Sequence, residues 1–454
     1  MSMDDIARAA GLHSSAQAQL LAELLAEEGL QPADENPFAR DPSGPRELSY
    51  NQLRLWFLEQ LSPGQPIYNV PAAVTLPAPV DIAVLERAAR ELHRRHDILR
   101  TNIVSFDGVP AARIRRAGSF RLDVVDLRAL PNATQVAHAR RLVDHHSSRP
   151  FDLARDPLVR ICLYCIDAGY WVLSINMHHV VTDAWSMRIL VHELQALCAA
   201  GAPPEAITQT QPVVQYSDYA AWQRRTQTAE ALASDLAWWG QELAGSVATE
   251  LPADRPPPER PTRQGAKATL PFSAGLSERV RALGRGHDAT TFMVLVAGFV
   301  TLLGRLTERH DITIGTVVPG RDHPALQHAL GFFSNTIVLR ARLEADPTVA
   351  ELVEDVRRRI LAARAHEHVP FNLVVERLAP DRGSGDQPLF RIAFLASRDA
   401  PDGDFGRWPV HAGRSRFDLT VQAIEGDAQI SLDAEYDLER FDATHVEGLL
   451  RQFR

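Results

Sequence analysis

The chain has 454 residues, of which 45% are hydrophobic and 23% charged, and its formal net charge is −9. This length favours two large lobes over a single core, and an acidic balance without a run of Lys and Arg argues against nucleic-acid binding. The start "MSMDDIARAA" lacks a signal-like apolar core and no apolar stretch could span a bilayer, so we expect a cytoplasmic protein without membrane contact.

The first 46 residues predict a helical appendage and a linker. Residues 15–30, "SAQAQLLAELLAEEGL", place leucines at helical spacing. Residues 31–46 are polar and rich in Pro, as linkers are. We expect the helix to pack on the main fold, and the alternative is a docking element for an upstream protein.

Helix-like and strand-like segments alternate from residue 47 onward. The pattern predicts helices at 81–100, 185–200, 291–306 and 348–367, and strands at 170–177, 311–319 and 335–343. The Pro-rich, charged stretch 251–265 interrupts this alternation. We therefore predict an α/β fold with one lobe at 47–225, an inter-lobe segment at 226–265 and a second lobe at 266–454.

The three cysteines do not predict a disulfide framework or a zinc site. Cys162 and Cys165 form the pair "CLYC" inside an apolar run that reads as a strand, and no second pair completes a metal site. We expect buried, reduced thiols, which suit the cytosol.

The stretch "NMHHVVTDAWS" carries the strongest chemical signal. His178 and His179 stand at the end of a predicted strand, where successive side chains point to opposite faces. Only one of them can therefore act on a given substrate. Asp183 precedes a predicted helix and could simply cap it, or it could turn inward onto an arginine and fix the loop.

Several kinds of site are not supported by this stretch. It offers two usable metal ligands at best, whereas zinc needs at least three. The sequence has neither a G-x-S-x-G elbow nor a G-x-x-x-x-G-K-[ST] phosphate loop. A histidine with an ordinary pKa near 6.5 remains, which suits proton transfer or positioning of an amine in an acyl transfer.

At this point the sequence resembles a known family, the condensation domains of nonribosomal peptide synthetases. "MHHVVTDAWS" resembles the family's H-H-x-x-x-D-G signature. Six further segments match its other motifs in the same order: "SYNQLRLWFLEQL", "RRHDILRTNI", "YSDYAAWQ", "GFFSNTIVLR", "HEHVPFNLVVERL" and "DRGSGDQPLFRIAF". Together they cover the chain from Ser49 to its end.

The resemblance implies a chloramphenicol-acetyltransferase-like fold, with two α/β lobes in a V and an active-site tunnel between them. It implies that upstream and downstream peptidyl carrier proteins present substrates tethered to phosphopantetheine, next to an adenylation domain of the full synthetase. The donor thioester would be attacked by the α-amine of the acceptor to form a peptide bond. No cofactor or metal bound by this domain is implied, because a thioester is already activated.

The resemblance also assigns roles to individual residues. His179 would be the catalytic histidine, as a base or as a positioner of the amine, and His178 its structural neighbour. Asp183 would hold the loop through a salt bridge, for which we expect Arg100 as the partner. Such pairing would offset the cost of burying the two charges.

The sequence departs from the family pattern at one position of the signature. Ala184 stands where the family has glycine. If that position needs a positive φ, alanine is costly there, but if it is the first residue of a helix, alanine is well tolerated, which we expect. A single histidine pair preceded by Met177 is typical of an ordinary domain, closest to the subtype that joins an L-residue donor to an L-residue acceptor.

Other residues of the matched motifs are expected mainly to line the tunnel or to pack. Trp185, Ser334 and Asn335 are candidates for lining it, and Asn335 could instead form hydrogen bonds at a crossover. Trp56 and Phe57 are expected in the core, and Tyr216 as a packing residue.

Two rival functions remain open. One is an acyltransferase of the H-x-x-x-D type that uses coenzyme A, which "DFGRW" at 404–408 faintly resembles. The other is a non-catalytic domain that recruits a partner. The chain itself reads as one excised module of a longer synthetase, expected to be monomeric.

Overall fold

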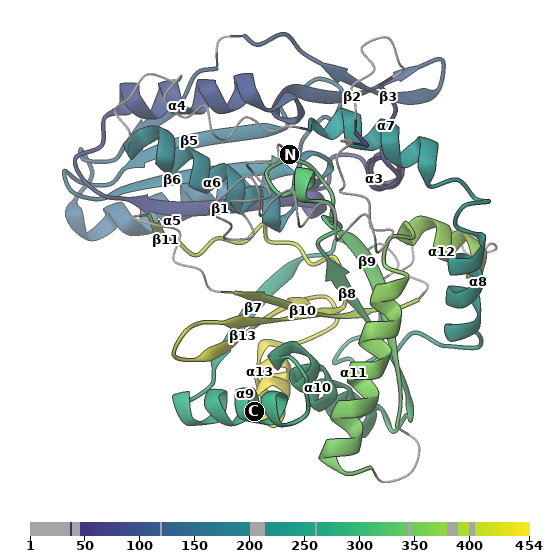
Figure 1. The fold of residues 1–454 in the computed structure, drawn as a ribbon. Coiled ribbons are helices and arrows are strands. Elements are labelled where there is room, and N and C mark those ends of the chain that lie inside the picture. Colours follow the sequence, from purple (N-terminus) through teal and green to yellow (C-terminus); the bar gives the residue numbers. More distant parts are fainter. Residues whose placement is uncertain are drawn as a thin grey trace, which may run out of the picture. The chain divides into compact units, whose positions relative to one another are not determined.

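The computed structural model describes residues 37–38, 46–118, 120–199, 214–258, 261–343, 347–378, 389–398 and 405–454. The chain divides into two compact units, Met1–Gly44 and Pro45–Arg454. The elements below all belong to the second unit (Figure 1). The helix predicted at 15–30 and most of the motif segment 381–394 lie outside the described residues.

The first half of this unit is built around a five-stranded sheet in the order β11-β1-β6-β5-β4. Helix α5 packs on β1 and β6, and α4 packs on α6. The elements of this half are α3 (Tyr50–Leu61), η1 (Pro66–Tyr68), β1 (Asn69–Leu76), α4 (Ile82–Arg95), η2 (Asp97–Arg100), β2 (Thr101–Phe106), β3 (Val109–Ile114), β4 (Asp123–Asp126), α5 (Asn132–Ser148), β5 (Val159–Cys165), β6 (Trp171–His178), η3 (His179–Val181), α6 (Ala184–Ala199) and α7 (Tyr216–Thr226).

The second half contains a six-stranded sheet in the order β7-β13-β12-β10-β8-β9. Helices α10 and α11 pack on each other and on strands β8 and β9. Its elements are α8 (Ala233–Glu242), β7 (Gly265–Pro271), α9 (Ala274–Gly286), α10 (Thr291–Thr307), β8 (Asp311–Val318), η5 (Pro324–Leu326), β9 (Asn335–Arg342), α11 (Val349–Ala365), α12 (Phe371–Leu378), β10 (Ile392–Arg398), β11 (Gly406–Arg407), β12 (Leu419–Glu425), β13 (Ile430–Asp437) and α13 (Ala443–Phe453).

Strand β6 is the central element for the site. It pairs antiparallel with β1 on one side and with β5 on the other, and all eight of its residues are buried. A strand buried on both faces carries little polar character except at positions with defined partners. The turn that carries His179 therefore begins at the end of a buried, central strand of this sheet.

One strand joins the two halves. The short strand β11 follows β10 in the chain, yet it pairs antiparallel with β1, with Val74 opposite Arg407. The sheet of the first half therefore includes a segment that comes from the second half. Nothing in the hydrophobic pattern of the sequence predicts this two-residue strand.

The structure confirms the α/β fold class and the elements predicted around the histidine stretch. The strand predicted at 170–177 is β6, and the helix predicted at 185–200 is α6. Helix α10 is apolar on most of its surface because it is a core helix, with ten buried residues. The V-shaped arrangement and the tunnel stay predictions.

No single helix in the described ranges has both the length and the apolar character needed to cross a membrane. Helices α9 and α10 reach the required length and apolar character only when they are counted together, and the chain bends by 104° between them.

Candidate active site

The histidine stretch forms a tight turn between β6 and α6. The strand ends at His178, residues His179–Val181 form the 3₁₀ turn η3, and α6 begins at Ala184. The side chain of His178 caps η3 by accepting a hydrogen bond from Val180 N at 3.1 Å. This geometry fixes the backbone of both histidines.

The ring of His179 is half-buried and held in one tautomer. Its Nδ1 lies 2.7 Å from the carbonyl oxygen of Thr182. Because a carbonyl can only accept, Nδ1 carries the proton and Nε2 carries the lone pair in the neutral ring. The ring also contacts Phe332, with 4.3 Å between the ring centroids. His179 thus presents a defined proton acceptor.

His179 is neutral near pH 7. Burial lowers its pKa well below 6.5, and the positive charge of Arg416 lowers it further. Arg416 comes from the segment before β12, in the second half of the chain, where its Nε donates to the carbonyl of Ile67 at 3.4 Å. A residue from the second half therefore helps to keep the imidazole unprotonated.

Removing the charge of Arg416 is expected to shift the acidic limb of the pH–rate profile. The folded-state pKa of His179 lies below its ordinary value, so activity that needs the neutral ring survives to lower pH. In Arg416→Met the pKa of His179 rises, and the acidic limb moves to higher pH. Turnover rates measured between about pH 4.5 and 8 check this, with the exposed Arg128→Met as the control; superimposable limbs would contradict it.

His178 has the opposite tautomer and different partners. Since its Nδ1 accepts from Val180 N, the proton of the neutral ring sits on Nε2, which lies 3.3 Å from Oε1 of Glu59 in α3. The residue is buried, and burial lowers its pKa. As expected from the sequence, the two adjacent histidines engage different surroundings.

The carboxylate of Asp183 joins the two halves of the chain. Its Oδ1 accepts from Ser186 N at 2.7 Å, which is the helix-cap contact predicted as one alternative. Its Oδ2 accepts from the backbone N–H groups of Phe333 and Ser334 at 3.0 and 3.1 Å. Only 2% of the residue is exposed, so every one of these contacts is made away from water.

The predicted pairing of Asp183 with Arg100 is wrong. The cation next to Asp183 is Arg321, whose Nη2 lies 3.5 Å from Oδ1. The guanidinium of Arg100 instead bonds to Asp97 and to the carbonyl oxygens of His93 and Arg115. Arg100 belongs to η2, where the carboxylate of Asp97 lies only three residues away in the chain. The guanidinium of Arg100 therefore pairs with Asp97.

Arg321 is bound on several sides, as a buried cation requires. It donates to the carbonyl oxygens of Leu326 and Ala329 and to Oγ of Ser186. Its guanidinium also lies over the ring of Phe333, 4.1 Å from the centroid. It therefore fixes the start of α6 and its own loop at once.

The loop 331–334 has no space for a larger first residue. Ser186 Oγ bonds to both the carbonyl and the N–H of Gly331, at 2.8 and 3.0 Å. A Cβ added to Gly331 would lie 1.9 Å from Cδ2 of Tyr216, whose hydroxyl donates to the carbonyl of Phe332. The loop is thus pressed against α6 and α7, and Tyr216 is the packing residue expected.

Ala184 is the first residue of α6 and is not among the described non-glycine residues with positive φ. Ala184→Gly is therefore expected to lower the free energy of unfolding by no more than about 1 kcal/mol, because glycine is a weaker helix former than alanine. The rate of amide formation should change little. Urea unfolding and turnover assays on the two proteins check this; a large gain in rate would show that the position needs glycine.

The three candidates for lining the tunnel have different surroundings. Trp185 Nε1 donates to the carbonyl of Gln327 at 3.2 Å. The backbone N–H of Ser334 donates to Asp183, and its carbonyl accepts from the side-chain amide of Asn51. The amide of Asn335 donates to the carbonyls of 367 and 369 and accepts from the N–H of 371. For Asn335 this fits the alternative of a crossover hydrogen bond.

Helix α3 contradicts the expectation for Phe57, which is 50% exposed. Besides Leu55, the buried residues of α3 are polar: Asn51, Gln52 and Glu59. These side chains bond to the histidine loop and to Ser334, so the apolar residue on the opposite face is left in solvent. Sequence reasoning missed Gln52, Glu59 and Arg321; the signal for Arg321 was a cation shortly after the end of β8.

The cysteines and the potential metal ligands give no sign of a second reactive centre among the described residues. No cluster of three or more His, Cys, Asp or Glu with the geometry of a metal site occurs among the described residues. The cysteines are free, Cys162 and Cys165 are buried as predicted, and burial raises the pKa of Cys162 and of Cys198 to about 11. Their thiols are therefore protonated and weak as nucleophiles near pH 7.

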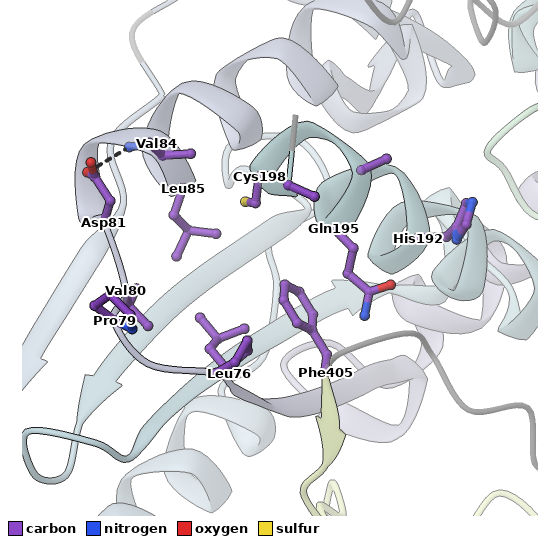
Figure 2. A pocket seen from close by; sticks show the side chains of 13 residues that line it. Leu76, Pro79, Val80, Asp81, Val84, Leu85, His192, Gln195, Cys198 and Phe405 are labelled. Carbon is purple, nitrogen blue, oxygen red and sulfur yellow. Dashed lines mark hydrogen bonds between the residues drawn. The ribbon is translucent and has the colours of Figure 1, made fainter. Parts of the chain in front are cut away.

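An apolar cavity of about 480 Å³ lies between α4, α6 and the end of β1. Figure 2 shows Leu85 from α4 and Phe405 beside β11 turned toward it, with Cys198 on α6 at its edge. None of its lining residues belongs to the turn 178–183. The cavity and the histidine turn are therefore separate features.

Comparison with known proteins decides the family. The family model of the condensation domain matches residues 44–454. The chain belongs to the condensation domain family. This condensation domain is 35% identical over 418 residues to one of the linear gramicidin synthase proteins of Brevibacillus parabrevis, and the alignment covers 90% of the chain but 8% of that protein. It is 34% identical over 422 residues to phosphinothricin tripeptide synthetase PhsC of Streptomyces viridochromogenes, covering 91% of the chain and 39% of that protein.

Solved structures agree with this assignment. The X-domain in complex with OxyB, from teicoplanin biosynthesis, superposes with a TM-score of 0.81 at 26% identity, covering 93% of this condensation domain and 94% of that chain. The starter condensation domain of rhizomide synthetase gives a TM-score of 0.79 at 21% identity, covering 90% and 93%, which supports the fold alone. The family and the fold predicted from the motifs are thereby confirmed.

Proposed function

We propose that this condensation domain forms an amide bond between a donor acyl thioester and the α-amine of an acceptor aminoacyl thioester. The observation that carries the proposal is the neutral, half-buried His179, whose Nδ1–H is held by Thr182 and whose Nε2 therefore carries a lone pair. The names of its relatives, gramicidin synthase and phosphinothricin tripeptide synthetase, support peptide synthesis.

The chemistry follows from this arrangement. An α-amine has a pKa near 8, so most of it is protonated at pH 7 and the reactive neutral form needs an acceptor for its second proton. As the amine nitrogen attacks the thioester carbonyl, the C–N bond forms and its proton passes to Nε2 of His179. The C–S bond then breaks, and the leaving thiolate takes the proton from Nε2 of His179, which restores the neutral ring. Holding both reactants in place could contribute about 7 to 11 kcal/mol to the acceleration.

The partners in this proposal are two carrier proteins and, within a full synthetase, a neighbouring adenylation domain. Phosphopantetheine belongs to the carriers, so the domain itself requires no bound cofactor. Both substrates are proposed to be L-configured, as in the subtype that the signature resembles.

The form of the donor gives the decisive test. The purified chain is incubated with an aminoacyl-loaded acceptor carrier and with the same donor acyl group, either on a carrier or on free coenzyme A. We expect amide product on the acceptor carrier with the carrier-bound donor and much less with the coenzyme A thioester. Equal or faster reaction of the coenzyme A thioester would favour the rival acyltransferase.

A second candidate, recruitment of a partner protein, is favoured by the similarity to the X-domain, whose structure was solved in complex with OxyB. It predicts no amide product from the folded, unmutated chain with any pair of loaded carriers. The same incubation therefore separates the two functions.

A further inference from the structure

Helix α3 supports the histidine turn with two buried polar side chains. Gln52 Nε2 donates to the carbonyl of Val180 at 3.1 Å, and Glu59 Oε1 lies 3.3 Å from His178 Nε2. The two residues are seven positions apart, which places them on the same helix face, two turns from each other. Their contacts are with Val180 and His178, the residues on either side of His179.

Glu59 has a defined chemical task at this contact. The Nδ1 of His178 accepts from Val180 N and caps the turn η3, so in the neutral ring the N–H must be on Nε2. With 2% of His178 and 7% of Glu59 exposed, water does not supply the acceptor for this N–H. Without Glu59 the buried Nε2–H would lose its partner, at a cost that a change of tautomer or ring orientation would relieve.

Either change would disturb His179. Flipping the tautomer puts a proton on His178 Nδ1, where it faces the N–H of Val180 and removes the cap of η3. The same three-residue turn holds the Thr182 carbonyl that fixes the proton on Nδ1 of His179. The orientation of Nε2 of His179 thus depends on a carboxylate that does not touch it.

We propose that Glu59 is a positioning residue for His179, acting through His178 by accepting its Nε2–H. This inference rests on the proposed function, because it assigns a purpose to the orientation of His179. It adds a residue of α3, far from the signature in the sequence, to the groups on which the reaction depends.

Two substitutions of similar size separate this role from general stability. Glu59→Gln retains an oxygen that can accept from His178, whereas Glu59→Met does not. We expect Glu59→Met to lower kcat by about 10- to 100-fold, as loss of supporting hydrogen bonds does at other sites, with KM for both carriers unchanged. Glu59→Gln should retain most of the rate, and the exposed Gln60→Met on the same helix controls for a methionine in α3.

Histidine-selective nitrogen NMR supplies a readout that does not depend on activity. The unmutated chain should show protonated Nε2 for His178 and protonated Nδ1 for His179, and Glu59→Met should lose both states while remaining folded. The inference is overturned if these signals persist in Glu59→Met, or if Glu59→Met has the same kcat as Gln60→Met. It is also overturned if Glu59→Gln and Glu59→Met lose the same fraction of the rate and both raise KM. If the unmutated chain forms no amide, the proposed function fails and the NMR comparison alone decides the role of Glu59.

Discussion

His179→Ala is expected to lower the rate of amide formation by about 10²- to 10⁴-fold, the range found when a general acid–base group is lost. The substitution removes Nε2, the acceptor that the turn 178–182 holds in a fixed tautomer. It leaves the contacts of His178, Asp183 and Arg321 in place, so the fold should persist. Single-turnover rates with loaded carriers, together with thermal unfolding, measure both effects.

The control for this variant is His192→Ala, an exposed histidine on α6. It removes the same atoms from the helix that follows the turn without touching the turn, and its rate should match that of the unmutated chain. A His179→Ala protein that reacts as fast as His192→Ala would remove the assigned role of the ring.

Arg321→Met is expected to lower the free energy of unfolding by about 3 to 5 kcal/mol, the usual cost of removing one partner of a buried ion pair. The variant leaves the Asp183 carboxylate without its cation and the carbonyls of Leu326 and Ala329 without their donor. Because Asp183 also holds the N–H groups of Phe333 and Ser334, the rate of amide formation should fall as well. Urea unfolding and single-turnover assays measure the two losses.

Arg100→Met is the matched control, since it tests the partner first expected for Asp183. Its guanidinium contacts Asp97 rather than Asp183, so the reaction rate should persist even if some stability is lost. If Arg100→Met lost activity and Arg321→Met kept it, the pairing of Asp183 with Arg321 would be refuted.

The sequence predicted those parts of the site that depend on local pattern. An apolar, β-branched run indicated β6, and Asp183 ahead of an amphipathic segment indicated the start of α6 and its cap. Ala184 was expected to be tolerated as a helical residue, and it has that conformation. Periodicity and capping suffice for such elements because each is decided by neighbouring residues.

Contacts between distant segments could not be read in the same way. Arg100 lies in a segment that matches a family motif and Arg321 does not, and only the packing of the loop before β9 against α6 shows that Arg321 is the partner of Asp183. Glu59 is buried and Phe57 is exposed, against the usual rule that helices bury their apolar face, because polar side chains of α3 bond to the histidine turn. The pairing of β11 with β1 depends on two residues, too few to carry a pattern.

The most direct test of the central claim is the mass of the acceptor carrier after one turnover. The unmutated chain is mixed with a donor carrier and an acceptor carrier, each loaded with an L-aminoacyl thioester. If the neutral imidazole at position 179 promotes amide formation, the acceptor carrier gains the mass of the donor acyl group while the donor carrier loses it. If the folded chain leaves both carriers with their original loads, the claim is contradicted.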